Sequence, residues 1–106
     1  MMKKAGVPIL PGTENSVKSV EEAGAAAEEI GYPVMIKASG GGGGRGLRVA
    51  QNRKDLVNSF ATAKKESAAA FGLSDVFIEK YVERPHHIEF QILADKHGNT
   101  VHLGER

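Results

Sequence analysis

A run of glycines beside two basic residues is the part of this sequence best suited to chemistry. Gly40 to Gly44 are five consecutive glycines, Arg45 and Gly46 follow them, and Lys37 stands three residues before them. Glycine backbone N–H groups form a concave surface of donors with no side chains in the way, and such a surface suits phosphate oxygens. The two basic side chains add positive charge. The segment is therefore predicted to hold the phosphates of a nucleotide.

The residues around the glycines distinguish between three known types of phosphate-binding loop. A Walker A loop needs Lys-Ser or Lys-Thr after its second glycine, and neither pair follows. Gly41, Gly43 and Gly46 satisfy G-x-G-x-x-G, but a dinucleotide-binding loop must open directly into a helix. Here LRVA follows, which is typical of a strand. The remaining arrangement is strand–loop–strand, as in kinases, although no kinase catalytic-loop motif is present. A hairpin tip that binds nothing is the structural alternative.

A second candidate region begins at Glu79-Lys80-Tyr81-Val82, where an apolar segment turns polar on its way to Pro85. The backbone of such a segment can offer C=O and N–H groups to a flat heterocycle such as adenine. The alternative is a strand that becomes polar as it reaches solvent. His86 and His87 follow. Because adjacent side chains on a strand point apart, we expect surface or ribose-contacting histidines rather than a metal pair.

Composition excludes several other classes of function. The chain has no cysteine, so disulfides and zinc–thiolate sites are absent. Its net charge of +1 argues against a dedicated nucleic-acid-binding protein. No segment approaches the roughly 20 apolar residues of a membrane span. No Ser-His-Asp set or carboxylate pair is evident, and Mg²⁺ bound with ATP usually takes one or two carboxylates. The chain is therefore predicted to supply part of an ATP site.

The elements that must position these residues follow from caps, breakers and periodicity. Ser19 and Glu22 form a capping-box pattern that predicts a helix to about Ile30. Asn52 is the expected cap of a second helix, and Gly72 is its expected end. The predicted strands are Val34–Ala38, Leu47–Ala50, Val76–Val82, His87–Asp95 and Thr100–Leu103. Strand alternation places Lys37 on one face with Met35. The fold class is α+β, with two helices and a mainly antiparallel sheet.

The chain of 106 residues fits one small domain. It begins abruptly and stops directly after a strand, so both ends are expected to be cuts through a larger protein.

Four stretches of the sequence resemble the biotin carboxylase family of ATP-grasp ligases, which serves acetyl-CoA, propionyl-CoA, methylcrotonyl-CoA and pyruvate carboxylases. They are GYPVMIKA from Gly31, the glycine loop to Arg48, IEKY from Ile78 and HIEFQIL from His87. The resemblance extends over essentially the whole chain. It implies an ATP-grasp B-type subdomain, a lid over ATP, at residues 19–84. Residues 1–18 would enter from an N-terminal subdomain, and residues 85–106 would start the C subdomain sheet.

The resemblance also implies which residues bind ATP. Lys37 corresponds to a lysine near the phosphates and adenine, and Gly43 and Gly44 to the loop that covers the phosphates. Glu79, Lys80 and Val82 correspond to the adenine-binding connector, and His87 to a histidine on the ribose side. The full set of expected ATP-binding residues is Lys37, Gly43, Gly44, Arg45, Leu47, Glu79, Lys80, Val82 and His87. No catalytic residue and no metal ligand is expected within this stretch.

In this family ATP phosphorylates bicarbonate to carboxyphosphate, and CO₂ then passes to N1 of biotin on a carrier domain. The resemblance thus implies ATP and Mg²⁺ as cofactors, with the metal ligands outside this chain, and bicarbonate and a biotin carrier as partners. A homo-oligomeric parent enzyme is expected, in the bacterial cytoplasm or in a mitochondrion or plastid, with a role such as fatty acid biosynthesis. The isolated chain is expected to be inactive. The alternatives are another ATP-grasp ligase, such as a carbamoyl phosphate synthetase, or a stand-alone nucleotide-binding module.

Overall fold

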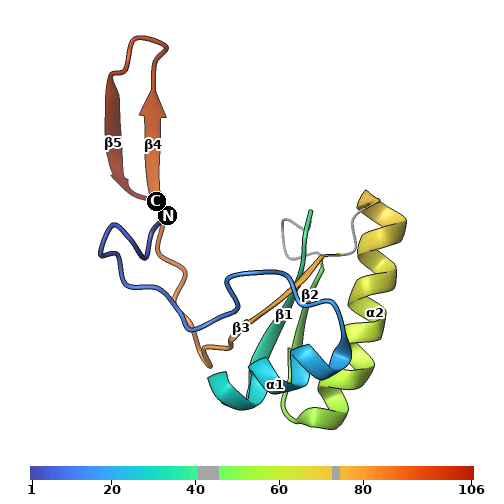
Figure 1. The fold of residues 1–106 in the computed structure, drawn as a ribbon. Coiled ribbons are helices and arrows are strands. Elements are labelled where there is room, and N and C mark those ends of the chain that lie inside the picture. The colour runs from blue at the N-terminus through green and yellow to red at the C-terminus, as the bar shows by residue number, and fades with distance from the viewer. Residues whose placement is uncertain (41–45, 73–74) are drawn as a thin grey trace.

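The computed structural model describes residues 1–40, 46–72 and 75–106, and it consists of two parts (Figure 1). The first part is a three-stranded sheet with two helices on one face. The second is a β-hairpin that stands away from that sheet. The elements are α1 (Val20–Ile30), β1 (Val34–Ala38), β2 (Leu47–Ala50), α2 (Arg53–Phe71), β3 (Val76–Lys80), β4 (Phe90–Ala94) and β5 (Thr100–Glu105). The predicted α+β class is confirmed.

The three-stranded sheet has the order β2-β1-β3, and both pairings are antiparallel. Its central strand β1 alternates strictly between buried and half-buried residues. Val34 and Ile36 are fully buried, whereas Met35 and Lys37 lie on the opposite face. The predicted alternation is therefore confirmed, and Lys37 projects away from the helices.

Both helices begin and end at residues that the sequence identifies. The hydroxyl of Ser19 accepts from the Glu22 backbone N–H at 3.2 Å, and the Asn52 side chain accepts from the Asp55 N–H at 2.9 Å. Such caps satisfy backbone donors that the first turn leaves without partners. Gly72 ends α2 in the left-handed conformation, with φ of +66°. A side chain is disfavoured there, which is why glycine stands at this stop.

The core lies between the helices and the sheet. Its largest fully buried side chains include Ile36 on β1, Leu56 on α2 and Ile78 on β3. Ser67 of α2 is also buried, and its hydroxyl donates to the Ser39 carbonyl at 3.0 Å. This bond ties α2 to the end of β1, just before the glycine segment, residues 40–46. The helices thereby fix the position of the strand that carries Lys37.

The hairpin of β4 and β5 is antiparallel, with a register shift between Phe90 and Ile92. Asp95 closes its loop by accepting the backbone N–H groups of His97 and Asn99 and the Asn99 side-chain amide. The strands differ slightly from the predicted ranges. β3 ends at Lys80 rather than Val82, β4 begins at Phe90, and β5 continues to Glu105, because backbone pairing and not residue type sets these limits.

The N-terminal segment, residues 1–18, adds a partial fourth strand beside β3. Isolated bridges join Gly12 to Glu79 and Val17 to Val76, and the Thr13 N–H donates to the Ile78 carbonyl at 2.8 Å. Val17 is buried in the core cluster. Within the part of the chain that the structure describes, no helix is long and apolar enough to cross a membrane.

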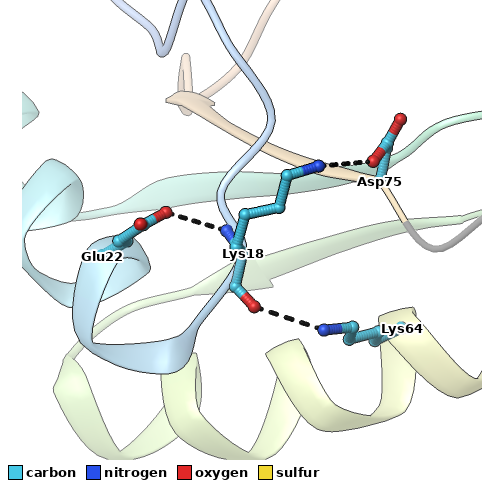
Figure 2. Close-up of polar contacts among 4 residues, drawn as sticks. All are labelled: Lys18, Glu22, Lys64 and Asp75. Carbon is cyan, nitrogen blue, oxygen red and sulfur yellow. Dashed lines mark hydrogen bonds and ion pairs between the residues drawn. The ribbon is translucent and has the colours of Figure 1, made fainter.

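Lys18 connects this segment to three other elements (Figure 2). Its backbone N–H donates to Glu22 of α1 at 2.8 Å, and its carbonyl accepts from the Lys64 ammonium of α2 at 3.2 Å. Its own ammonium donates to Asp75, just before β3, at 3.0 Å. The hydrogen bond from Lys18, followed by its Coulomb attraction, lowers the pKa of the Asp75 carboxyl below its usual value of 3.8.

We expect Lys18→Met to lower the urea midpoint of unfolding slightly at neutral pH and not at strongly acidic pH. A carboxyl whose folded-state pKa is depressed adds stability above its unfolded pKa, and this stability is lost as pH falls through the lower folded-state value. The difference between wild type and variant should therefore shrink as pH drops below 3.8 and vanish once pH is below the folded-state pKa of Asp75. Urea unfolding across this range measures it, with exposed Lys65→Met as the control. A pH-independent difference would show that the Lys18–Asp75 pair is not its source.

Candidate functional site

The sheet face opposite the helices carries the candidate site. Six side chains of β1, β2 and β3 share this face, which we call the open face: Met35, Lys37, Leu47, Val49, Phe77 and Glu79. Four of them are apolar, and the remaining two carry opposite charges. None of the six is among the buried residues of the core. The open face therefore offers a flat apolar surface with a charged pair, which suits a planar heterocycle with polar edges.

Lys37 and Glu79 form that charged pair. Lys37 lies opposite Phe77 in the register, so Glu79 is its diagonal neighbour on β3. The Lys37 Nζ is 2.7 Å from a Glu79 carboxylate oxygen, with 41% and 29% of the two side chains exposed. Both residues were predicted to bind ATP, but a contact between them was not predicted. Their contact creates a donor and an acceptor side by side, half shielded from water.

A backbone hydrogen bond joins the residues on the two sides of the glycine segment. The Ala38 N–H donates to the Gly46 carbonyl at 2.8 Å, which joins β1 to β2 at the base of the connection. Because β2 pairs with β1 and helix α2 begins only at Arg53, the strand–loop–strand arrangement is confirmed. A dinucleotide-binding loop, which opens into a helix, is excluded. The predicted residues Gly43, Gly44 and Arg45 lie outside the described residues. Leu47, which is described, lies on the open face.

The connector after β3 holds the other predicted residues. Lys80 follows Glu79 and therefore points to the helix side of the sheet, where its ammonium donates to the carbonyls of Gly31 at 2.9 Å and Tyr32 at 3.2 Å. Val82 is exposed beyond the end of the strand. The Lys80 side chain thus has partners of its own, away from the Lys37–Glu79 pair.

His87 lies further along, at the base of the hairpin. Its Nε2 is 2.9 Å from a carboxylate oxygen of Glu89, and its side chain is 83% exposed. Glu89 also meets the Arg106 guanidinium at 3.4 Å and accepts the Arg106 backbone N–H. The structure places His87 in this group with Glu89 and Arg106. His87 and Glu89 are close in sequence, whereas Arg106 reaches them only because β5 pairs with β4, so this third member could not be predicted from local sequence.

The N-terminal segment lines a cavity that the sequence did not reveal. This open cavity, of about 960 Å³, reaches from the segment to the β3 residues Phe77, Ile78 and Glu79. Apolar side chains of the segment, including Ile9 and Leu10, form part of its wall. It exists because the segment runs along the edge of β3, which is a tertiary contact without a local sequence signature. Glu79 therefore belongs both to the lining of this cavity and to the open face.

No group of three or more His, Asp or Glu side chains that could hold a metal ion occurs within residues 1–40, 46–72 and 75–106. The carboxylate nearest the glycine segment on the open face, Glu79, is already neutralised by Lys37. Among the described residues, the Lys37–Glu79 pair therefore offers one donor and one acceptor to a ligand on the open face.

Comparison with known families gives one match that covers the chain. Residues 1–106 match the family described as the carbamoyl-phosphate synthase L chain, ATP binding domain. The chain is 56% identical over 106 residues to the 2-oxoglutarate carboxylase small subunit of Hydrogenobacter thermophilus, covering 100% of this chain and 22% of that protein. It is 59% identical over 105 residues to the chloroplastic biotin carboxylase 1 of Populus trichocarpa, covering 99% and 20%. The chain thus spans about a fifth of the length of these relatives.

Solved structures show the same similarity. The biotin carboxylase domain dimer of Hydrogenobacter thermophilus 2-oxoglutarate carboxylase was crystallised with MgADP, ADP and bicarbonate. It matches with a TM-score of 0.91 and 56% identity, covering 98% of this chain and 23% of that one. Biotin carboxylase of Campylobacter jejuni, in a complex with a β,γ-ATP compound, also matches with a TM-score of 0.91, at 47% identity and with the same coverage.

Proposed function

Because this chain belongs to the biotin carboxylase family, within the group defined by the carbamoyl-phosphate synthase L chain ATP-binding domain, we propose that its open face binds the adenine end of ATP. The observation that carries this proposal is the Lys37–Glu79 pair, which lies on an apolar sheet face directly before the glycine segment. The glycine segment would then cover the phosphates.

The pair fits one edge of adenine. That edge presents N7, which accepts a hydrogen bond, next to the 6-amino group, which donates one. The Lys37 ammonium can donate to N7 while the Glu79 carboxylate accepts from the amino group. Guanine also presents N7, but beside it stands O6, which is an acceptor and would face the carboxylate. A donor and an acceptor 2.7 Å apart in this order therefore favour adenine over guanine.

The remaining predicted residues complete the proposed nucleotide site. Leu47 would pack on the ring from the open face, and Val82 would offer its backbone at the connector. Gly43, Gly44 and Arg45 would contact the phosphates. His87 would approach the ribose only when the hairpin is positioned near the ligand. In this proposal residues 19–84 form a lid, residues 1–18 lead into it, and residues 85–106 begin the sheet that opposes it.

The activity proposed for the whole enzyme is ATP-dependent carboxylation of biotin. Bicarbonate oxygen attacks the γ-phosphorus of ATP, releasing ADP and forming carboxyphosphate, which breaks down to CO₂ and phosphate. N1 of biotin, whose proton is taken by a base outside this chain, then takes up the CO₂. Lys37 and Glu79 bind and orient ATP and take part in none of these bond changes. When bound, Mg²⁺ would neutralise phosphate charge, held by carboxylates outside this chain. A biotin carrier domain, a homo-oligomeric enzyme and a bacterial cytoplasmic or plastid location belong to this proposal. The Populus relative is chloroplastic by name, and the Hydrogenobacter structure is a domain dimer.

We expect the isolated chain of 106 residues to bind ATP in the millimolar range at best, on the order of −4 kcal/mol. It should not cleave ATP when bicarbonate is added, because the described residues include no metal-binding carboxylate cluster. An NMR titration measures the binding, and release of phosphate measures the cleavage. Binding of ATP that Lys37→Met abolishes supports the proposal. A chain that binds no ATP at tens of millimolar, or that hydrolyses ATP with bicarbonate, contradicts it.

A further inference from the structure

Lys80 stands at the point where β3 ends and the connector begins, and its contacts are unlike those of Lys37. Both lysines are on the same sheet, but they project from opposite faces. The Lys80 ammonium reaches the C-terminal end of α1, where it donates to the Gly31 carbonyl at 2.9 Å and the Tyr32 carbonyl at 3.2 Å. These two bonds are partly buried, which makes them stronger than exposed ones.

A cation beside the C-terminal end of α1, which is Ile30, is stabilising. The carbonyl groups at a helix C-terminus carry partial negative charge and lack partners within the helix. The last turn of α1 contains no basic residue. Lys80 therefore supplies from a different element the positive charge that a helix often supplies from its own last turn.

The backbone of the same residue anchors the start of the connector. The Lys80 backbone N–H donates to the Pro11 carbonyl at 2.8 Å, and the next N–H, of Tyr81, donates to the Pro33 carbonyl at 3.2 Å. Beyond Lys80 the chain is no longer part of the strand. The connector is thus held between the N-terminal segment and the turn that joins α1 to β1, and the Lys80 ammonium adds two more bonds to that turn.

We propose that Lys80 is a positioning residue, whose ammonium holds the connector of Tyr81 and Val82 against the α1–β1 turn so that the connector backbone is ready for the base of the nucleotide. This inference rests on the proposed nucleotide function. It assigns the Lys80 side chain no contact with the ligand. Glu79 and Lys80 thus have different roles in this proposal. The Glu79 side chain contacts the adenine base, and the Lys80 side chain holds the neighbouring backbone in position.

The proposal predicts a pattern that separates Lys80 from Lys37. The connector would contact the adenine base, which AMP and ATP share. Loss of its alignment should therefore weaken the binding of AMP and of ATP by the same factor. Loss of Lys37 should weaken the binding of ATP more than that of AMP, because Lys37 lies just before the glycine segment that would cover the phosphates. A Lys80→Arg variant keeps donors for both carbonyls and should preserve most of the affinity.

Two measurements on the 106-residue chain test the proposal, with exposed Lys54→Met on α2 as the control. Amide hydrogen exchange of the nucleotide-free protein should become faster at Tyr81 in Lys80→Met than in wild type. NMR titrations with AMP and with ATP should each show about three- to tenfold weaker binding in Lys80→Met, near wild-type binding in Lys80→Arg, and no change in Lys54→Met. A melting curve shows that each variant is folded.

The outcomes are distinct. Faster exchange at Tyr81 together with equal losses for AMP and ATP supports the positioning role. Wild-type binding of both nucleotides by folded Lys80→Met overturns it and leaves the proposed function standing, as does a loss for ATP alone, which would indicate a phosphate contact. A wild-type chain that binds neither nucleotide overturns the proposed function and the positioning role with it.

Discussion

Replacement of Lys37 by Met, in an enzyme of full family length that contains this chain, is expected to lower kcat/KM for ATP by about 30- to 1000-fold. Met keeps the packing of the side-chain stem on the open face and removes only the ammonium. A charge that meets the nucleotide in a partly desolvated cleft is worth roughly 2–4 kcal/mol, by analogy with other lost charge-assisted donors. The structure adds a second cost, because the Glu79 carboxylate loses its partner at 2.7 Å.

The fold should tolerate this change. Lys37 and Glu79 are both partly exposed, and ion pairs of this kind contribute less than about 1 kcal/mol to stability. Steady-state kinetics and a melting curve on the same protein therefore separate a binding defect from a folding defect, with Lys54→Met as the matched lysine control. Near-normal ATP kinetics in folded Lys37→Met would show that this lysine is a solvated strand residue and nothing more.

Replacement of Glu79 by Gln is expected to reduce the preference for ATP over GTP by about 5- to 150-fold, which corresponds to roughly 1–3 kcal/mol for a base-edge contact. A carboxylate only accepts hydrogen bonds, so it suits the adenine amino group and opposes the guanine O6. A glutamine amide can present either its oxygen or its NH₂ group and no longer distinguishes the two. The change is nearly isosteric, so the shape of the open face is retained.

The ratio of kcat/KM values for ATP and GTP measures this effect. The control is Glu21→Gln in the first turn of α1, an exposed glutamate outside the open face. It should leave the ratio unchanged. If Glu79→Gln weakens both nucleotides equally, Glu79 acts by holding Lys37 in place. A Glu79→Gln enzyme with the wild-type ratio and wild-type ATP kinetics would remove Glu79 from the site.

The local signals in the sequence were enough to predict most elements of the fold. Ser19, Asn52 and Gly72 mark helix ends through hydrogen bonds or backbone conformations that involve only neighbouring residues. The alternation of Val34 to Ala38 identifies the buried face of β1 without reference to any other strand. Because these features depend only on neighbouring residues, they can be predicted from a single sequence.

The contacts of the site could not be predicted in the same way. That Lys37 meets Glu79 depends on the register of β1 with β3, and no residue in either strand specifies this register alone. The direction of Lys80 toward α1 follows from the same register. The place of Val17 in the core, and the cavity beside β3, depend on how the N-terminal segment crosses the sheet edge. All of these contacts depend on how distant segments pair in the tertiary structure, and the types of the neighbouring residues do not determine that pairing.

Intermolecular NOEs in the wild-type chain with AMP test most directly whether the open face binds adenine. The base protons H2 and H8 should show NOEs to side chains of the open face, with Met35 and Leu47 as the nearest methyl groups. Lys37→Met should weaken these NOEs at the same AMP concentration. NOEs confined to the helix face, for example to Val57 of α2, or to the hairpin residues Ile92 and Val101, would contradict an adenine site on the open face.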